Sequence, residues 1–195
     1  MQDMRPTPGC DGGWWRARRV GLQGAVFVGL LITATSSPAW VNWETYVSVE
    51  DGFSVRFPTP PIFFDVLFGT KSESIAAYHR YTASADVESF SVDVVQFEPA
   101  VHMVKTDSAL LAAAVDRAAG AICHAGEYRE IETSGRLSHD VVFECPDEWT
   151  RRIRFIIVDG RLYQVEVSGG PDVAINKSAE RFLNSFRLAA DGAPQ

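Results

Sequence analysis

Few residues of this 195-residue sequence are suited to redox, metal or nucleophilic chemistry, and those present stand far apart. The chain has three cysteines and four histidines, with no C-x-x-C pair, no G-x-S-x-G turn and no two histidines four positions apart. A thioredoxin-type redox centre, an α/β-hydrolase nucleophile and a helical zinc site each need one of these spacings. The sequence therefore predicts no cofactor, no metal site and no enzyme built on a local motif.

A long hydrophobic run is also lacking. The longest mostly apolar stretch, Val20 to Ala34, contains Gln23 and is shorter than the roughly 20 residues of a membrane-spanning helix. It follows Arg5, Arg16, Arg18 and Arg19 and precedes the small residues Ser37-Pro38-Ala39. A basic start, an apolar centre and a small-residue exit are typical of a secretory signal. We expect residues 1–39 to be a cleaved signal peptide, with no stable membrane anchor, and the protein to be periplasmic or secreted.

Positive charge is scarce. The chain has 18 basic and 25 acidic residues. Residues 1–39 contain four of the basic and two of the acidic residues. The mature chain therefore has 14 basic and 23 acidic residues. An acidic domain repels phosphate backbones and anionic lipid, which disfavours nucleic acid as a partner.

The cysteines agree with export. Cys10 falls in the signal segment, and an even pair, Cys123 and Cys145, remains. In an oxidising compartment such a pair favours a disulfide, worth about 3 kcal/mol in the chain-entropy model.

Alternating apolar and polar residues predict strands, and 3.6-residue spacing predicts two helices. The first helix follows Thr106-Asp107-Ser108 and ends at Gly126, and its buried residues are Leu111, Val115, Ala118 and Ile122. The second helix is defined by Ile175, Ala179, Phe182 and Phe186. The predicted strands are 40–49, 53–57, 62–68, 72–83, 90–97, 128–133, 137–145, 150–158 and 161–168. This order indicates one α+β domain over residues 40–188, an antiparallel β-sheet packed by helices, and a flexible tail at 189–195.

Three segments resemble the PsbP-like superfamily: Tyr46 to Pro58 (YVSVEDGFSVRFP), Gly160 to Val165 (GRLYQV) and Ala179 to Phe186 (AERFLNSF). The superfamily includes a photosystem II extrinsic subunit, a Ran-binding import factor and uncharacterised exported bacterial domains. The resemblance implies an antiparallel sheet sandwiched by helices, an α/β/α sandwich, and a role in binding or assisting other proteins. It carries over no active-site residue, because the matching positions are turns, core aromatics and a helix stripe.

Two groups of residues are candidates for function. His79, His139 and Asp140 are the ones around which a hydrolase or other enzyme could assemble in three dimensions. Ser138, His139 and Asp140 cannot themselves form a triad, since neighbours on a strand point to opposite faces. The second group, Trp149, Arg151, Arg152 and Arg154, could bind a partner or an anionic ligand, or form a solvated strand face.

The segment Pro60 to Phe68 has apolar residues on both strand faces. This pattern favours a fully covered strand, and the alternative is a hydrophobic patch that docks a partner. Together these observations predict an exported, non-catalytic domain that binds an envelope protein or a small ligand.

Overall fold

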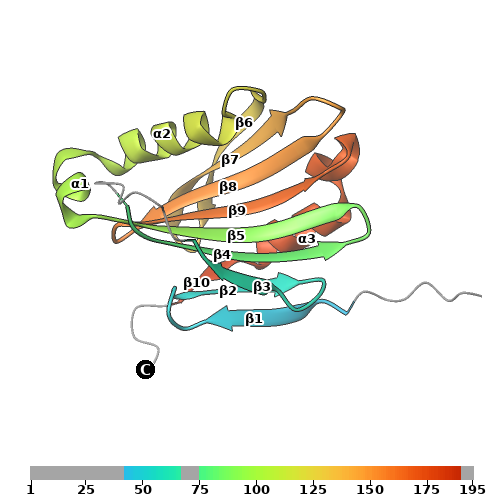
Figure 1. Cartoon of the computed structure of the whole chain (residues 1–195), viewed down its shortest axis with the longest axis horizontal. Coiled ribbons are helices and arrows are strands. Elements are labelled where there is room, and N and C mark those ends of the chain that lie inside the picture. Colours follow the sequence, from blue (N-terminus) through green and yellow to red (C-terminus); the bar gives the residue numbers. More distant parts are fainter. Residues whose placement is uncertain (1–41, 67–74, 190–195) are drawn as a thin grey trace, which may run out of the picture. The chain divides into compact units, whose positions relative to one another are not determined.

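Two antiparallel sheets make up most of the computed structural model, which describes residues 42–66 and 75–189. The larger sheet has seven strands in the order β3-β4-β5-β9-β8-β7-β6 (Figure 1). Its strands are β3 (Ile62–Asp65), β4 (Ile75–Ala85), β5 (Glu88–Phe97), β6 (His124–Thr133), β7 (Arg136–Glu144), β8 (Thr150–Val158) and β9 (Arg161–Gly169). Two meanders, β3 to β5 and β6 to β9, meet where β5 pairs with β9.

A smaller sheet covers part of one face of the larger sheet. It consists of β1 (Glu44–Ser48), β2 (Phe53–Phe57) and β10 (Arg187–Leu188), with β2 in the middle. Phe53, Val55 and Phe57 alternate along β2 and are buried against the large sheet. The 3-10 helix η1 (Pro171–Ile175) and helix α3 (Lys177–Ser185) complete this face, with Phe182 and Leu183 fully buried.

The opposite face is covered by helices α1 (Pro99–Val104) and α2 (Asp107–Ala119), so that α2 and α3 lie on opposite sides of the sheet (Figure 1). Leu110, Leu111 and Ala114 of α2 pack against Phe143 and Phe155 of the sheet. Thr106 caps α2 by accepting a hydrogen bond from the Ala109 amide, as its sequence predicts.

The predicted antiparallel sheet with helices is therefore confirmed, and the helix sandwich only in part. Helices cover one face, but the other is shared by α3 and the small sheet. The small sheet escaped prediction because β10 is only two residues long and pairs with β2 far away in the sequence.

Both predicted helices differ in detail from those observed. Gly120 takes φ 59° and ψ −146° and ends α2 there, so Ile122 is exposed and Gly126 belongs to β6 instead of ending the helix. Ile175 is also exposed, because the chain makes a 3-10 turn before α3 begins after Asn176.

The expected signal peptide, residues 1–39, and most of the expected tail lie outside the described residues. Ala189, the first residue of that tail, donates a backbone hydrogen bond to Gly52. Within the described ranges, no helix is both long and apolar enough to span a membrane.

Candidate functional site

The arginines of β8 point to opposite faces of the sheet. Arg152 and Arg154 lie on the α3 side and are only 3% and 5% exposed. Both donate to Asp140 on β7, and Arg152 also donates to the carboxylate of Glu180 on α3. Two buried arginines cannot contact a partner, so this part of the predicted binding group is wrong: these residues join α3 to the sheet.

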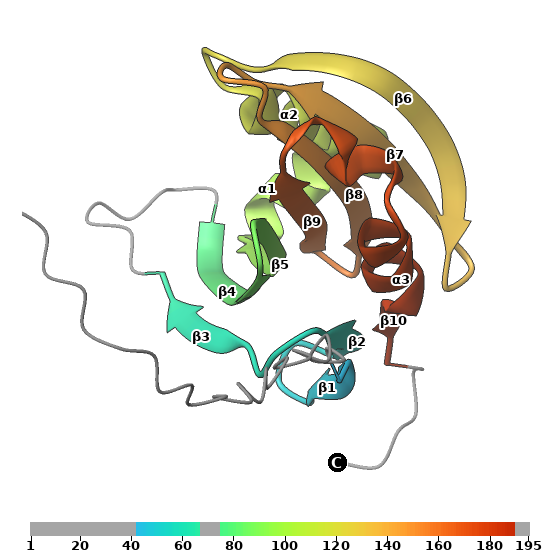
Figure 2. The same cartoon turned by 90° about the vertical axis from the view of Figure 1, so that its right-hand side faces the viewer.

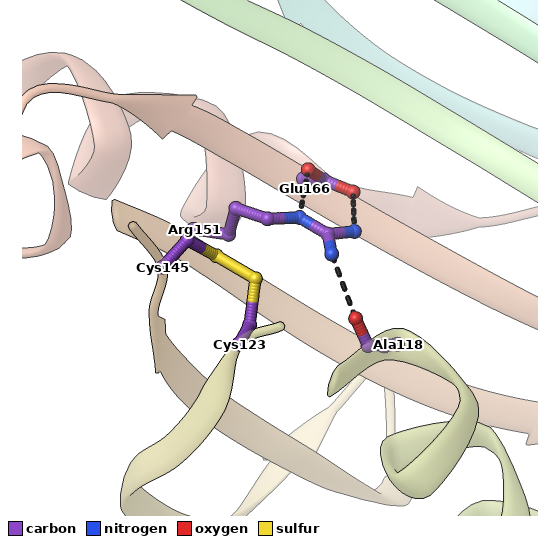
Figure 3. The surroundings of a disulfide bond; sticks show 5 residues. All are labelled: Ala118, Cys123, Cys145, Arg151 and Glu166. Atoms are coloured by element: carbon purple, nitrogen blue, oxygen red, sulfur yellow. Dashed lines mark hydrogen bonds and ion pairs between the residues drawn. A yellow bond between two sulfur atoms is a disulfide. The ribbon is translucent and has the colours of Figure 1, made fainter. Parts of the chain in front are cut away.

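Arg151 faces the other way, toward α2. Its guanidinium makes two hydrogen bonds to the Glu166 carboxylate, at 2.7 and 2.9 Å, and a third to the carbonyl of Ala118 at 2.7 Å (Figure 3). The contact to Ala118 satisfies a carbonyl in the last turn of α2, where a positive charge also favours the helix dipole. Arg151 therefore fixes the end of α2, while the neighbouring Trp149 stays partly exposed and its binding role remains a prediction.

Cys123 and Cys145 form a disulfide beside Arg151 (Figure 3). Cys123 lies between the end of α2 and β6, and Cys145 follows β7. Both contact the apolar core beneath α2. The bridge and Arg151 thus hold the same helix end to the sheet by independent means.

The residues proposed for an enzymatic site do not come together. His139 faces the α2 side of β7, with Tyr128 against its ring, whereas Asp140 faces the α3 side. His79 lies on β4, separated from β7 by β5, β9 and β8, or about 19 Å at the usual strand spacing. Each of the three is held by a separate set of neighbours, so this geometry provides no shared reaction centre.

A polar centre that the sequence did not reveal surrounds Asp51, in the turn between β1 and β2. His79 Nδ1 lies 2.9 Å from its carboxylate, and the Tyr81 hydroxyl donates to the same carboxylate at 2.6 Å. The Tyr163 hydroxyl donates to the Asp51 carbonyl. Burial and the bond to Asp51 raise the pKa of Tyr81, which keeps the phenol protonated as a donor. In the sequence, Asp51 and Gly52 form an Asp-Gly pair, which is typical of a tight turn but does not predict this centre. The centre anchors the small sheet on the large one.

Strand β3 is the most exposed apolar element of the large sheet. Ile62, Phe63 and Phe64 are 62%, 47% and 47% exposed, so the predicted fully covered strand is wrong for these residues. Among the described strands β3 forms one edge of the sheet and β6 the other (Figure 2). Phe63 packs its ring against His79 and Tyr81, with centroids 5.5 and 5.1 Å away, while Phe64 lies across from Arg80. The last two residues of the predicted strand, at positions 67 and 68, lie outside the described ranges.

A mainly apolar cavity of about 80 Å³ lies between α2 and the large sheet. Val95, Leu110, Ala114 and Leu162 contribute to its wall. In residues 42–66 and 75–189, no three histidine, cysteine or carboxylate side chains gather in a way that could hold a metal ion.

No protein-family model and no curated protein sequence matches the chain. The solution structure of cyanobacterial PsbP from Synechocystis sp. PCC 6803 is similar to it, with a TM-score of 0.51 and 14% identity over 80% of this chain and 98% of that one. Two crystal structures align with TM-scores of 0.42. One is a Pseudomonas aeruginosa protein of unknown function, with 12% identity over 78% of this chain and 97% of that one. The other is the Ran-binding protein Mog1p of Saccharomyces cerevisiae, with 10% identity over 76% of this chain and 97% of that one. At such identities the likeness concerns the fold, and the expectation from the sequence is confirmed at that level: the chain has a PsbP-like fold.

Proposed function

We propose that the mature chain is an exported, non-catalytic domain that binds a protein of the cell envelope at the edge strand β3. The observation that carries this proposal is the exposure of Ile62, Phe63 and Phe64 at a sheet edge. An edge strand presents backbone donors and acceptors to which an extended segment of another protein can add. Three exposed apolar side chains give such a segment a surface to cover.

The two edges of the sheet differ in a way that supports this choice. The β6 edge carries Glu127, Arg129, Glu130 and Glu132 and has an irregularity in its pairing with β7. Charges and bulges on an edge discourage the addition of another strand. Of the four residues of β3, only Asp65 is charged. The chain thus protects one edge and leaves the other apolar.

The rest of the proposal draws on the signal-like start and the disulfide. A disulfide persists in an oxidising compartment, so the pair Cys123 and Cys145 is compatible with export. The non-catalytic role draws on the arrangement of the buried polar groups, since Asp51, Asp140 and Glu166 each bond to side chains of the fold itself.

A photo-crosslinking amino acid at position 64 tests the proposed surface in cells that produce the full chain. We expect one adduct of defined mass from the envelope fraction, and no such adduct from the same probe at Ile175, which is exposed elsewhere. An added Ile62→Lys substitution should suppress the adduct, because a charge on the edge opposes strand addition. Equal adducts from positions 64 and 175, or an adduct that survives Ile62→Lys, would contradict the proposal.

The export component has its own measurement. Intact-mass analysis of the protein from the periplasmic or secreted fraction should show a chain that begins at Trp40. A chain that retains residues 1–39 in the cytoplasm would contradict export while leaving the β3 surface open to the crosslinking test.

A further inference from the structure

Three arginines from separate elements line one pocket on the outer side of the small sheet. Arg56 belongs to β2, Arg181 to α3 and Arg187 to β10, and the pocket they share is open to solvent, with a volume of about 390 Å³. Thr45 and Ser54 contribute hydroxyl groups to its wall.

The strand register explains why these residues meet. Phe53, Val55 and Phe57 point into the core, so Ser54 and Arg56 point outward. Thr45 pairs with Arg56, and Arg187 pairs with Ser54. These partners lie on the same outer face. The Arg56 amide donates to the Ser185 hydroxyl at 2.9 Å, which brings the end of α3 beside β2.

The pocket arginines differ from several other arginines of the described ranges in having no carboxylate partner there. Arg80, Arg151, Arg152 and Arg154 are each paired with an aspartate or glutamate. Within the described ranges, none of the three pocket arginines forms an ion pair. The outward-facing positions of β1, β2 and β10 hold no acidic residue either.

Two of the guanidinium groups are held in place without being neutralised. Arg181 lies over the Trp43 ring, 5.0 Å from its centroid. Arg187 donates through Nη1 to the carbonyls of Asn184 and Phe186, both at 2.7 Å. Within the described ranges its Nε and Nη2 make no hydrogen bond, so these donors can serve a ligand. The Arg56 side chain makes no hydrogen bond to the described residues, so none of its donors is used within that part of the fold.

Gathering three positive charges costs free energy, and here it occurs in a chain of net charge −7. A bound anion removes this repulsion. Guanidinium forks match the oxygens of a phosphate group in geometry, and each of the two hydroxyls has one neutral O–H donor to add. The polar wall favours a compact oxyanion over an acid with a long apolar tail.

We propose that this pocket binds the phosphate group of a phosphate monoester. The pocket shares no residue with the β3 surface, so this proposal does not depend on the proposed partner binding. The phosphate can belong to a soluble phosphorylated compound or to a lipid headgroup, and the experiment separates these two sources.

The test is a titration of the isotope-labelled mature domain with inorganic phosphate at low ionic strength, followed by amide NMR shifts. We expect saturable shifts in residues 54–56 and 181–187. Arg56→Gln should weaken binding roughly fivefold, the size of one exposed ion pair, because this side chain has no partner among residues 42–66 and 75–189 and is free to pair with the phosphate. Arg56→Lys should restore part of the affinity. Arg136→Gln removes an exposed arginine elsewhere and is the matched control.

Shifts scattered over the surface, or equal weakening by Arg56→Gln and Arg136→Gln, would overturn the site, as would the absence of saturable binding. In a second arm, the domain is sedimented with vesicles of phosphatidylcholine alone or with added phosphatidic acid. Sedimentation that needs phosphatidic acid and is lost in Arg56→Gln assigns the phosphate to a lipid. Phosphate binding without such sedimentation assigns it to a soluble compound.

Discussion

Arg152 donates two hydrogen bonds to Asp140 inside the domain, at 2.9 and 3.0 Å, and neither side chain is more than 4% exposed. Arg154 donates to the same carboxylate at 3.0 Å. Ion pairs of this kind are costly to break because a charge is left without compensation in a medium of low dielectric. The pair therefore joins β7 to β8, and the contact of Arg152 with Glu180 extends this network to α3.

Asp140→Asn should destabilise the domain by about 3–5 kcal/mol, because Arg152 and Arg154 lose their shared negative charge. Urea unfolding followed by circular dichroism measures this change. Glu180→Gln is the matched control. Because Glu180 is half exposed, this substitution should lower the free energy of unfolding by less than about 1 kcal/mol. Equal losses in the two variants would show that Asp140 is not the centre of the network.

The same carboxylate predicts a pH dependence. Burial alone would raise the pKa of Asp140, but the hydrogen bonds and charges of Arg152 and Arg154 outweigh it and hold the pKa below its ordinary value of 3.8. A lowered pKa means stability that is present above pH 3.8 and is lost as the pH falls toward the folded-state pKa. The stability difference between the wild type and Asp140→Asn should therefore be largest at about pH 6 and shrink below pH 3.8. A constant difference over that interval would contradict the prediction.

Removal of the disulfide should lower the free energy of unfolding by about 3 kcal/mol, given the sequence separation of 22 between Cys123 and Cys145. The measurement compares urea unfolding of the protein with and without a reductant. The double variant Cys123→Ala, Cys145→Ala should match the reduced protein and not respond to the reductant. Two free thiols in natively purified protein would show that the bridge is not formed.

Gly120→Ala should destabilise the domain by about 1–3 kcal/mol through the backbone alone. Gly120 has φ 59° and ψ −146°, a conformation that side chains disfavour, although nothing lies within 4 Å of an added Cβ. Gly170 has equally open surroundings but φ −64°. Gly170→Ala should therefore be neutral or stabilise by about 0.4–1 kcal/mol. Thermal unfolding of the two variants gives the comparison, and a similar loss in both would point to a cause other than backbone strain.

Phe63→Ala and Phe64→Ala should differ in their effect on stability. Phe63 packs on His79 and Tyr81, and its loss should cost about 1 kcal/mol or more, whereas Phe64 makes no ring contact within the described residues and should cost less than about 0.5 kcal/mol. Chemical unfolding of both variants measures the difference. A large loss from Phe64→Ala would mean that this side chain packs within the fold and is not available to a partner.

The burial of the candidate site residues could not be predicted from the sequence. The side of β8 on which each arginine falls follows from strand alternation, but the sequence did not say that both faces of β8 are covered. Arg152 and Arg154 were therefore predicted to be accessible and are buried. The apolar pattern of Ile62, Phe63 and Phe64 favoured a covered strand, because the sequence does not show which strand lies at an edge of the sheet. These residues belong to an edge strand and are exposed.

The succession of strands β1 to β9 along the chain, the start of α2 and the pairing of Cys123 with Cys145 could be predicted from the sequence. Alternation and capping act over short distances, and an even cysteine count leaves one pairing. Tertiary structure alone decided the small sheet, the carboxylate shared by Arg152 and Arg154, and the meeting of Arg56, Arg181 and Arg187. These features join residues up to 131 positions apart, from Arg56 to Arg187. Local sequence preferences do not specify which distant side chains become neighbours when β5 pairs with β9 and joins the two meanders.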